Sequence, residues 1–496
     1  MELQWDKIAL PCFGLKVRQV QNQEQTLEVR LGDDMPDIGR IICGWGQNIL
    51  RGKQWNSDHM VVSGGIMAYI LYSPEDGSAP RCIQAWLPYS MKWNFDQSDR
   101  DGVIRANIHV KSVDARVLSS RKMMVRGCIS GMGEALEPKE VYFYSGGTDQ
   151  DHVHLLKRTY PVTVPVEVGE KTFLMDEDLE LPGKRLEKII SITVEPKLAE
   201  QKAVGGKAVF RGECRVHLVY FDAGNEICSA DLNVPFAQYA DLDRDYDKDA
   251  SVITMMVVTA MEPEAIDGLL RLKCGLTAQY VVMENRVLEL TQDAYSTTHE
   301  IDQHMETLQL PVVLDWRREN QMLNQTGPCE SMNVVDAACF MEHPVLRHND
   351  SLLEGVLPGT VQVLCKNDSG QYYGSHIRFS YPWSIPAAEE ADVCVMAQFA
   401  AAPSVTADGV NLHISVPVEL ETMATLTQQM DMICGLQIGR PLEQDVNRPS
   451  MILRRAGGES LWNLAKRYGS TVDAIKKVND LKDHADEGRM LLIPIN

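Results

Sequence analysis

The sequence lacks closely spaced cysteines. Twelve are present, and the closest two, Cys329 and Cys339, are ten residues apart. No CxxC pair and no spacing typical of a zinc site therefore occurs. The first residues, MELQWD, are too polar for a signal peptide, so we expect free thiols in a reducing compartment rather than disulfides.

A basic surface and long apolar runs are missing as well. The 69 acidic and 48 basic side chains give a formal net charge of -21, which argues against a binder of nucleic acid or of anionic membranes. No uninterrupted apolar stretch approaches the roughly 20 residues that cross a bilayer, so no transmembrane segment is predicted. With 44% hydrophobic and 24% charged residues among 496, the composition predicts a soluble protein of several globular domains.

Catalytic signatures are the third absence. The sequence contains no GxxxxGK[ST], GxGxxG, GxSxG or HExxH motif. A Cys/His or Ser/His/Asp set dispersed along the chain would leave no such signature. We predict a protein that is not an enzyme, has no catalytic residues and needs no cofactor or metal.

What the sequence does contain is a threefold repeat. A proline followed by an aromatic residue recurs at intervals of 147 residues, at Pro88-Tyr89, Pro235-Phe236 and Pro382-Trp383. A glycine beside an apolar strand precedes each pair, at Gly64, Gly212 and Gly355. An acidic loop follows each pair, at Asp96 to Asp101, Asp241 to Asp249 and Glu389 to Asp392. Three features in the same order at one period indicate three copies of one domain.

Each copy shows the period of two that is typical of half-buried strands. In the first copy, apolar residues alternate with polar ones, which predicts one face in the core and the other in water: Ile104, Ala106, Ile108 and Val110 against Arg105, Asn107, His109 and Lys111. Asp267-Gly268 and Asp408-Gly409 are typical of tight hairpin turns with positive φ. The predicted fold class is mostly β, with three tandem antiparallel β-sandwich or barrel-like repeats followed by a small α+β module.

Domain joints are expected at two polar, turn-prone segments, residues 145–148 and 295–298. The predicted domains are the three repeats at residues 1–147, 148–297 and 298–440, a linker at 441–450 and a C-terminal module at 451–496.

The C-terminal module has a predicted βααβ order. Met451 to Arg455 and Met490 to Ile493 are the strand candidates. Ser460 and Thr471 can cap two helices, and Gly469 ends the first of them. In the second helix, three apolar residues are expected to point inward: Val472, Ile475 and Val478.

The run GGESLWNLAKRYGSTVDAIKKVNDL, followed by MLLIP, resembles a LysM domain. It departs from the family pattern at Gly457, where proline is usual, and at Arg455, where an apolar residue is usual. The resemblance implies a shallow groove for N-acetylglucosamine polymers, such as peptidoglycan or chitin, between two loops. Its residues would be Gly458, Glu459, Ser460, Leu461, Asp480, Leu481 and Lys482. Trp462 and Tyr468 suit packing better than sugar stacking, and a protein ligand is the alternative to a glycan.

The three repeats resemble SPOCS (DUF3794) repeats of endospore-forming bacteria, through their tandem β pattern and the boundary segments VLELTQDAYST and VYFYSGG. Three such repeats followed by one LysM domain are similar to the SpoIVA-interacting morphogenetic proteins of the spore coat. The resemblance implies a non-enzymatic adaptor in the mother-cell cytoplasm, at the forespore surface. Its repeats would form a scaffold, and its LysM domain would dock a coat scaffold protein, a SpoIVA-like ATPase. A cell-wall protein that binds N-acetylglucosamine polymers is the alternative.

Charge divides unevenly between the parts. From Val446 onward there are nine basic and six acidic residues, a charge of +3, which leaves -24 for the repeats. An acidic partner would suit a basic docking face made of Arg454, Arg455, Lys466, Arg467, Lys476 and Lys477. An ordinary solvated helical face would have the same composition.

The alternating aspartates from Asp241 to Asp249 resemble the start of a calcium loop. Tyr246, however, stands where an EF-hand needs glycine, and Val252 where it needs glutamate. We favour a solvated turn that keeps strand edges from pairing, with a divalent-ion site as the alternative.

Overall fold

The structure is a computed structural model of the chain. It describes residues 2–3, 5–146, 152–328, 333–349, 352–386, 390–443, 449–481 and 488–495. Strands dominate it, and every strand pairing is antiparallel. The predicted mostly-β fold class is confirmed. Gly147, Thr148, Glu389 and Lys482, which the sequence singled out, lie outside the described residues.

One order of strand pairing occurs three times. In each copy, which we call repeat 1, 2 or 3, the first strand pairs with the last and the last with the one before it, while the middle strands form a second sheet. Repeat 1 consists of β2 (Trp5–Arg30), β3 (Ile38–Trp55), β4 (His59–Pro74), β5 (Arg81–Asn94), β6 (Val103–Ser119) and β7 (Lys122–Gly146). Repeat 2 consists of β8 (Val153–Leu179), β9 (Lys188–Val204), β10 (Lys207–Phe221), β11 (Ile227–Asp241), β12 (Ser251–Ile266) and β13 (Leu269–Ser296).

Repeat 3 follows the same order with two of its strands interrupted. It consists of β14 (His299–Pro328), β15 (Val334–Met341), β16 (Val345–Asn349), β17 (Leu352–Lys366), β18 (Tyr372–Pro386), β19 (Asp392–Phe399), β20 (Ser404–Ala407) and β21 (Asn411–Pro441). The pair β15 and β16 stands where the other repeats have one strand, and so does the pair β19 and β20. The short β1 (Glu2–Leu3) pairs with the end of β21.

Each repeat has a core of its own between its two sheets. Examples are Met60 and Leu87 in repeat 1, Phe210 in repeat 2, and Leu357 and Val418 in repeat 3. Burial of apolar side chains between two packed sheets defines a β-sandwich. The sandwich architecture predicted for the repeats is therefore present.

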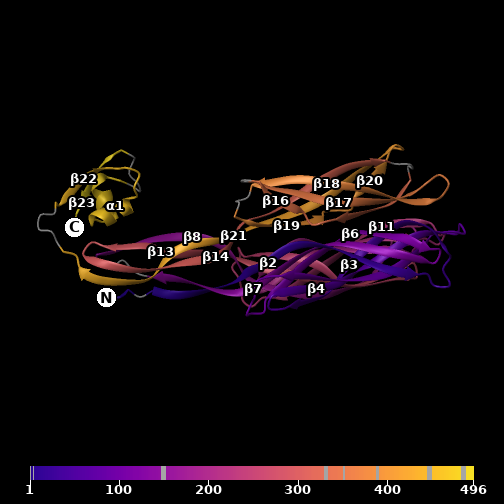
Figure 1. The fold of residues 1–496 in the computed structure, drawn as a ribbon, viewed down its shortest axis with the longest axis horizontal. Coiled ribbons are helices and arrows are strands. Elements are labelled where there is room, and N and C mark those ends of the chain that lie inside the picture. The colour runs from indigo at the N-terminus through magenta and orange to yellow at the C-terminus, as the bar shows by residue number, and fades with distance from the viewer. Residues whose placement is uncertain are drawn as a thin grey trace.

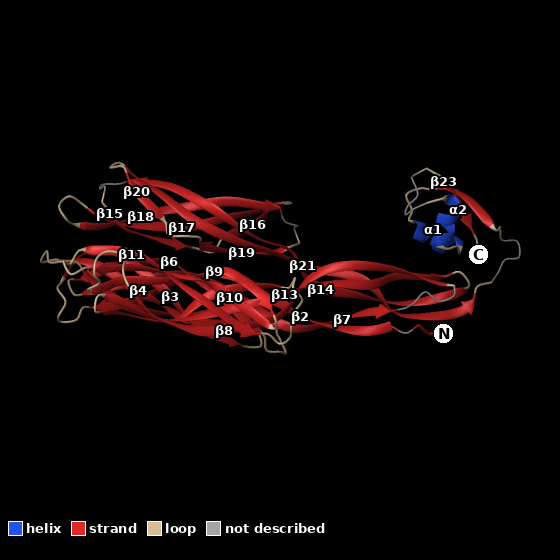
Figure 2. Cartoon of the chain, turned by 180° about the vertical axis from the view of Figure 1, so that it is seen from behind, coloured by secondary structure: helices blue, strands red, loops and turns tan. Residues whose placement is uncertain are grey.

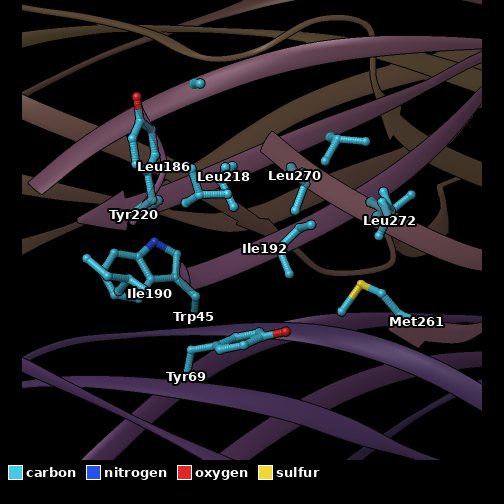
Figure 3. Packing of buried hydrophobic residues seen from close by; sticks show 14 of the residues in the cluster. Trp45, Tyr69, Leu186, Ile190, Ile192, Leu218, Tyr220, Met261, Leu270 and Leu272 are labelled. Atoms are coloured by element: carbon cyan, nitrogen blue, oxygen red, sulfur yellow. The ribbon is translucent and has the colours of Figure 1, made fainter. Parts of the chain in front are cut away.

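A further core joins the repeats to one another. Figure 3 shows Trp45 and Tyr69 of repeat 1 facing Ile190 and Leu218 of repeat 2. Leu364 and Tyr372 of repeat 3 belong to the same cluster. We call these residues the shared core, and they make the three sandwiches one packed body.

Beyond the sandwiches, the first and last strands of every repeat continue as two-stranded ribbons. Figures 1 and 2 show these ribbons running together from the body toward the C-terminal module. Their buried side chains form one cluster to which all three repeats contribute: Leu10, Cys12, Val141, Phe143, Val162, Val164, Leu288, Leu290, Leu308, Leu310, Val312, Met430 and Met432. We call this part of the molecule the stalk. At its tip β7, β13 and β21 end, and β8 and β14 begin.

The two features that defined the repeat in the sequence are neighbours across the strands. The glycine and the aromatic residue of each copy lie directly opposite one another: Gly64 and Tyr89, Gly212 and Phe236, Gly355 and Trp383. A Cβ added at Gly355 would lie 2.2 Å from the ring of Trp383. Glycine is needed at this position because the aromatic ring covers the backbone.

The C-terminal module has the predicted βααβ order, with β22 (Met451–Arg455), α1 (Leu461–Tyr468), α2 (Val472–Asn479) and β23 (Met490–Pro494). Ser460 accepts a hydrogen bond from the amide of Asn463, and Thr471 accepts one from the amide of Ala474. Gly469 ends α1 with a φ of 61°. These caps confirm the helix limits read from the sequence.

Two orientations predicted from the sequence are wrong. Val478 does not point into the module, since 42% of its surface is exposed at the last turn of α2. Arg105, expected on the wet face of its strand, is 2% exposed and paired with Glu134. The neighbouring repeats cover this face of β6, where His109 packs against His343 of repeat 3 with ring centroids 4.4 Å apart.

Other expectations concern turns and thiols. Asp267 and Gly268 both have positive φ, as the hairpin motif predicts, whereas at Asp408-Gly409 only the glycine does. The cysteines that the structure describes are all free thiols. None of the helices in the described part of the chain has the length and apolar character needed to span a bilayer.

Candidate functional site

The predicted groove residues flank the two helices of the C-terminal module, and their side chains are largely engaged. Ser460 caps α1, and Leu461 is buried in the module's core. The carboxylate of Glu459 accepts hydrogen bonds from Arg454 at 2.9 Å and from Arg467 at 3.1 Å. On the other side, Asp480 ends α2 in a left-handed conformation. Among the described groove residues, a ligand would therefore meet a Glu459 whose charge is balanced by two arginines, and side chains of Ser460 and Leu461 that are already engaged.

Asn479, part of the motif that marks this module, holds the loop after α2. Its buried side-chain amide donates to the carbonyls of Ile475 and Leu492 and accepts from the amide of Leu492. These bonds tie α2 to β23. Asn479 therefore has a structural role within the module.

The six residues of the predicted basic docking face are not all free. Arg454 and Arg467 share Glu459, and Arg455 donates to the carbonyl of Gly488 at 3.3 Å. Lys466 binds a carboxylate of repeat 2, described below. Lys476 and Lys477 lie in the last turn of α2. Most of these basic side chains therefore interact with other groups of the same chain.

The same module has an exposed apolar surface that was not predicted from the sequence. The outer face of the β22–β23 sheet carries Met451, Leu453, Met490 and Leu492, which are 37–59% exposed. Leu453 and Leu492 lie directly opposite each other on the paired strands. We call these four side chains the apolar sheet face. The alternation of inward and outward side chains expected for MILRR and MLLIP is the sequence signal for this surface.

The module also contacts the tip of the stalk. Asp293 of β13 accepts a hydrogen bond from the indole of Trp462 and an ion pair from Lys466. Tyr295 lies in the hydrophobic cluster of the module. No sequence signal connects these residues, which lie about 170 positions apart.

A cavity of about 340 Å³ lies where the three repeats meet. It is lined by residues of every repeat, and its polar wall includes Asn107, Glu195, Arg215, His217 and Asp231. His217 lies 3.0 Å from Asp231 and 2.9 Å from Asp336, whose other oxygen accepts from the indole of Trp45 at 3.2 Å. The chain Trp45–Asp336–His217–Asp231 thus connects repeats 1, 3 and 2.

Two histidines at these junctions have opposite charge preferences: His217, whose side chain is 12% exposed, and the buried His343. Burial alone would lower the pKa of His217, but the charge of Asp336 and the hydrogen bond to Asp231 raise it to about 10. Burial lowers the pKa of His343 to about 4, and its hydrogen bond to the carbonyl of Asn107 offsets this only in part. His217 is therefore a cation at neutral pH and His343 is neutral.

Aspartates of the acidic run after β11 accept hydrogen bonds from neighbouring segments. Asp245 accepts from the amide of Gly206 at 3.0 Å, and Asp249 accepts from Asn285 at 3.2 Å. Within the described ranges, no three His, Cys, Asp or Glu side chains gather as a metal site would require.

Comparison with known families identifies both parts of this architecture. Residues 185–266 match the family described as SipL, SPOCS domain, and residues 457–494 match the LysM domain. The chain combines a SPOCS domain with a LysM domain. No curated protein and no solved structure matches it.

The SPOCS match covers β9 to β12 of repeat 2, and repeats 1 and 3 have the same strand order around it. The LysM match covers both helices and β23. The predicted combination of SPOCS-like and LysM domains is thus confirmed, with the SPOCS match in repeat 2. Together the two families indicate a sporulation-related protein with a cell-wall-binding type of module, and both are binding rather than catalytic domains.

Proposed function

We propose that this protein is a non-enzymatic adaptor of spore-envelope assembly. The three repeats serve as a scaffold, and the LysM domain docks a protein of the spore coat. A SpoIVA-like ATPase scaffold is the candidate partner implied by the family resemblance. The adaptor acts at the forespore surface, on the mother-cell side.

The apolar sheet face of the LysM domain carries this proposal. Four large apolar side chains on one face of a two-stranded sheet cost free energy in water, about 25 cal/mol for each Å² left exposed. Contiguous apolar patches on small domains are typical of protein interfaces. Glu459, by contrast, is neutralised by two arginines and gives the groove little to offer a sugar hydroxyl.

Replacing Leu453 and Leu492 together by Asp tests the docking role. We expect the double variant of the full chain to lose capture of the purified SpoIVA-like scaffold, because two charges at the centre of the face would have to be desolvated on binding. Val287→Asp is the matched control, since Val287 is an exposed apolar residue of the stalk and should leave capture unchanged. Undiminished capture by a folded double variant would contradict the proposal.

Glycan binding in the groove is the second candidate, and one observation favours it. A Cβ added at Gly457 or Gly458 would meet no atom within 4 Å, so the described part of the chain does not cover the loop before α1 at these two glycines. Titration of chitin oligosaccharides or peptidoglycan fragments into the full chain tests this function. Heat of binding that disappears in Leu481→Ser, but persists in the Leu453/Leu492 variant, would assign the groove to glycans.

A further inference from the structure

The first helix of the LysM domain has a second contact face, which meets the stalk. Trp462 and Lys466 lie one turn apart on α1, and both reach the carboxylate of Asp293 on the stalk. The indole Nε1 of Trp462 donates to Oδ2 at 2.8 Å, and Nζ of Lys466 donates to Oδ1 at 2.6 Å. One carboxylate thus binds two donors from the same helix face, which fixes the helix orientation as well as its distance.

Tyr295, two residues further along β13, is nearly part of the LysM core. Its side chain is only 5% exposed and clusters with Leu461 and Ala465. Its hydroxyl donates to the carbonyl of Ser470 at 3.0 Å, and its ring lies 4.8 Å from that of Trp462 in an edge-to-face arrangement. The apolar core of the module is therefore completed by a residue of repeat 2.

The stalk presents both residues on a rigid support. The amide of Ala294 and the side chain of Gln303 on β14 donate to Oδ1 of Asp293. The ring of Tyr295 packs against His154 of β8 with centroids 5.1 Å apart. Although burial raises the pKa of Asp293, hydrogen bonds to Lys466 and Trp462 lower it overall, so the carboxylate is ionised at neutral pH.

The short segment between β21 and β22, which tethers the LysM domain to the stalk, favours contact within one chain over contact between two molecules. Nine residues separate the end of β21 from the start of β22. A segment of this length spans at most about 30 Å when fully extended. The LysM domain therefore remains near the stalk tip at a high effective concentration, and a contact that is weak between separate molecules becomes populated.

We infer that the stalk tip, at Asp293 and Tyr295, is a receptor surface for the chain's own LysM domain. Docking there engages the indole of Trp462 and the ammonium group of Lys466 with the stalk and leaves the apolar sheet face exposed. A partner that needs Trp462 must displace the stalk, whereas a partner that binds the apolar sheet face does not. The docked module is thus oriented by the scaffold rather than carried on a free tether.

Asp293→Ala tests this contact in the full-length protein with ¹⁵N-labelled tryptophan. Trp462→Phe assigns the indole signal of Trp462 among those of the eight tryptophans. In the wild type this signal should be as broad as those of the body, since the module tumbles with it. In Asp293→Ala it should shift and narrow several-fold, because the small module moves on its tether.

Two further variants separate the contact from general destabilisation. Glu289→Ala removes an exposed carboxylate of the same strand, paired with Lys157, and should leave the Trp462 signal unchanged. Lys466→Ala removes one donor from the LysM side and should shift the signal while the melting temperature of the body stays constant. A narrow Trp462 signal in the wild type would overturn the inference. So would a wild-type dimer in sedimentation that Asp293→Ala converts to monomers.

Discussion

At the residue scale, charged groups mark the junctions between the repeats. His217 is held between Asp231 of its own repeat and Asp336 of repeat 3, and Asp336 also binds Trp45 of repeat 1. Removing His217 would leave the buried carboxylate of Asp336 with the indole of Trp45 as its hydrogen-bond donor and without a cation, and the loss of a buried ionic partner commonly costs about 3–5 kcal/mol. The cluster therefore stabilises one relative arrangement of the three sandwiches.

His217→Gln should destabilise the protein in a pH-dependent way. The folded pKa of about 10 lies above the usual value of about 6.5. The stabilisation from the cation is therefore complete below about pH 6.5 and is lost as pH rises toward 10. We expect the variant to unfold about 3 kcal/mol more easily than the wild type at pH 6, and this difference to shrink by pH 10.

Urea unfolding of both proteins at pH 6, 8 and 10 measures this effect. His413→Gln is a suitable control, because His413 forms an exposed pair with Asp408 and should change stability by less than about 1 kcal/mol. A difference between His217→Gln and the wild type that stays constant with pH would contradict the assigned charge.

At the scale of the strands, the facing glycine and aromatic residue explain why the threefold repeat is recognisable in the sequence. In repeats 1 and 3 the ring leaves no room for a Cβ at the facing glycine, so the two motifs recur together at one spacing. The helices of the LysM domain could be predicted for a similar reason, since Ser460 and Thr471 cap them locally. Arg105 could not be placed, because the residues that bury it come from distant strands.

Gly355→Ala should destabilise repeat 3. The new methyl group would lie 2.2 Å from the ring of Trp383, which must move away from the backbone it covers. Overpacking of this kind costs about 1–3 kcal/mol. Gly14→Ala is the control, since its methyl would be 3.7 Å from the nearest atom, the side chain of Lys139. Equal thermal stability of the two variants would show that the ring does not depend on this glycine.

At the scale of the whole molecule, the stalk is the feature that the sequence does not reveal. Leu10, Val164 and Leu310 each lie in an alternating strand that would suit the core of any sandwich. Their shared cluster depends on three ribbons meeting, and no local pattern encodes that meeting. The same holds for Asp293 and Trp462, whose contact follows from the position of the tip and not from either motif.

Because the shared core and the stalk draw on all three repeats, the body should open as one cooperative unit. Leu310→Asp places a charge in the stalk cluster, where Leu310 is fully buried, and should cost several kcal/mol. Native-state hydrogen exchange should then show faster exchange in β2 and β8 as well as in β14, since the ribbons protect one another. Val345→Asp, at an exposed position of β16 in the same repeat, should alter none of them. Faster exchange confined to β14 and β21 would mean that the repeats are independently stable, and that the ribbons of the stalk do not stabilise one another.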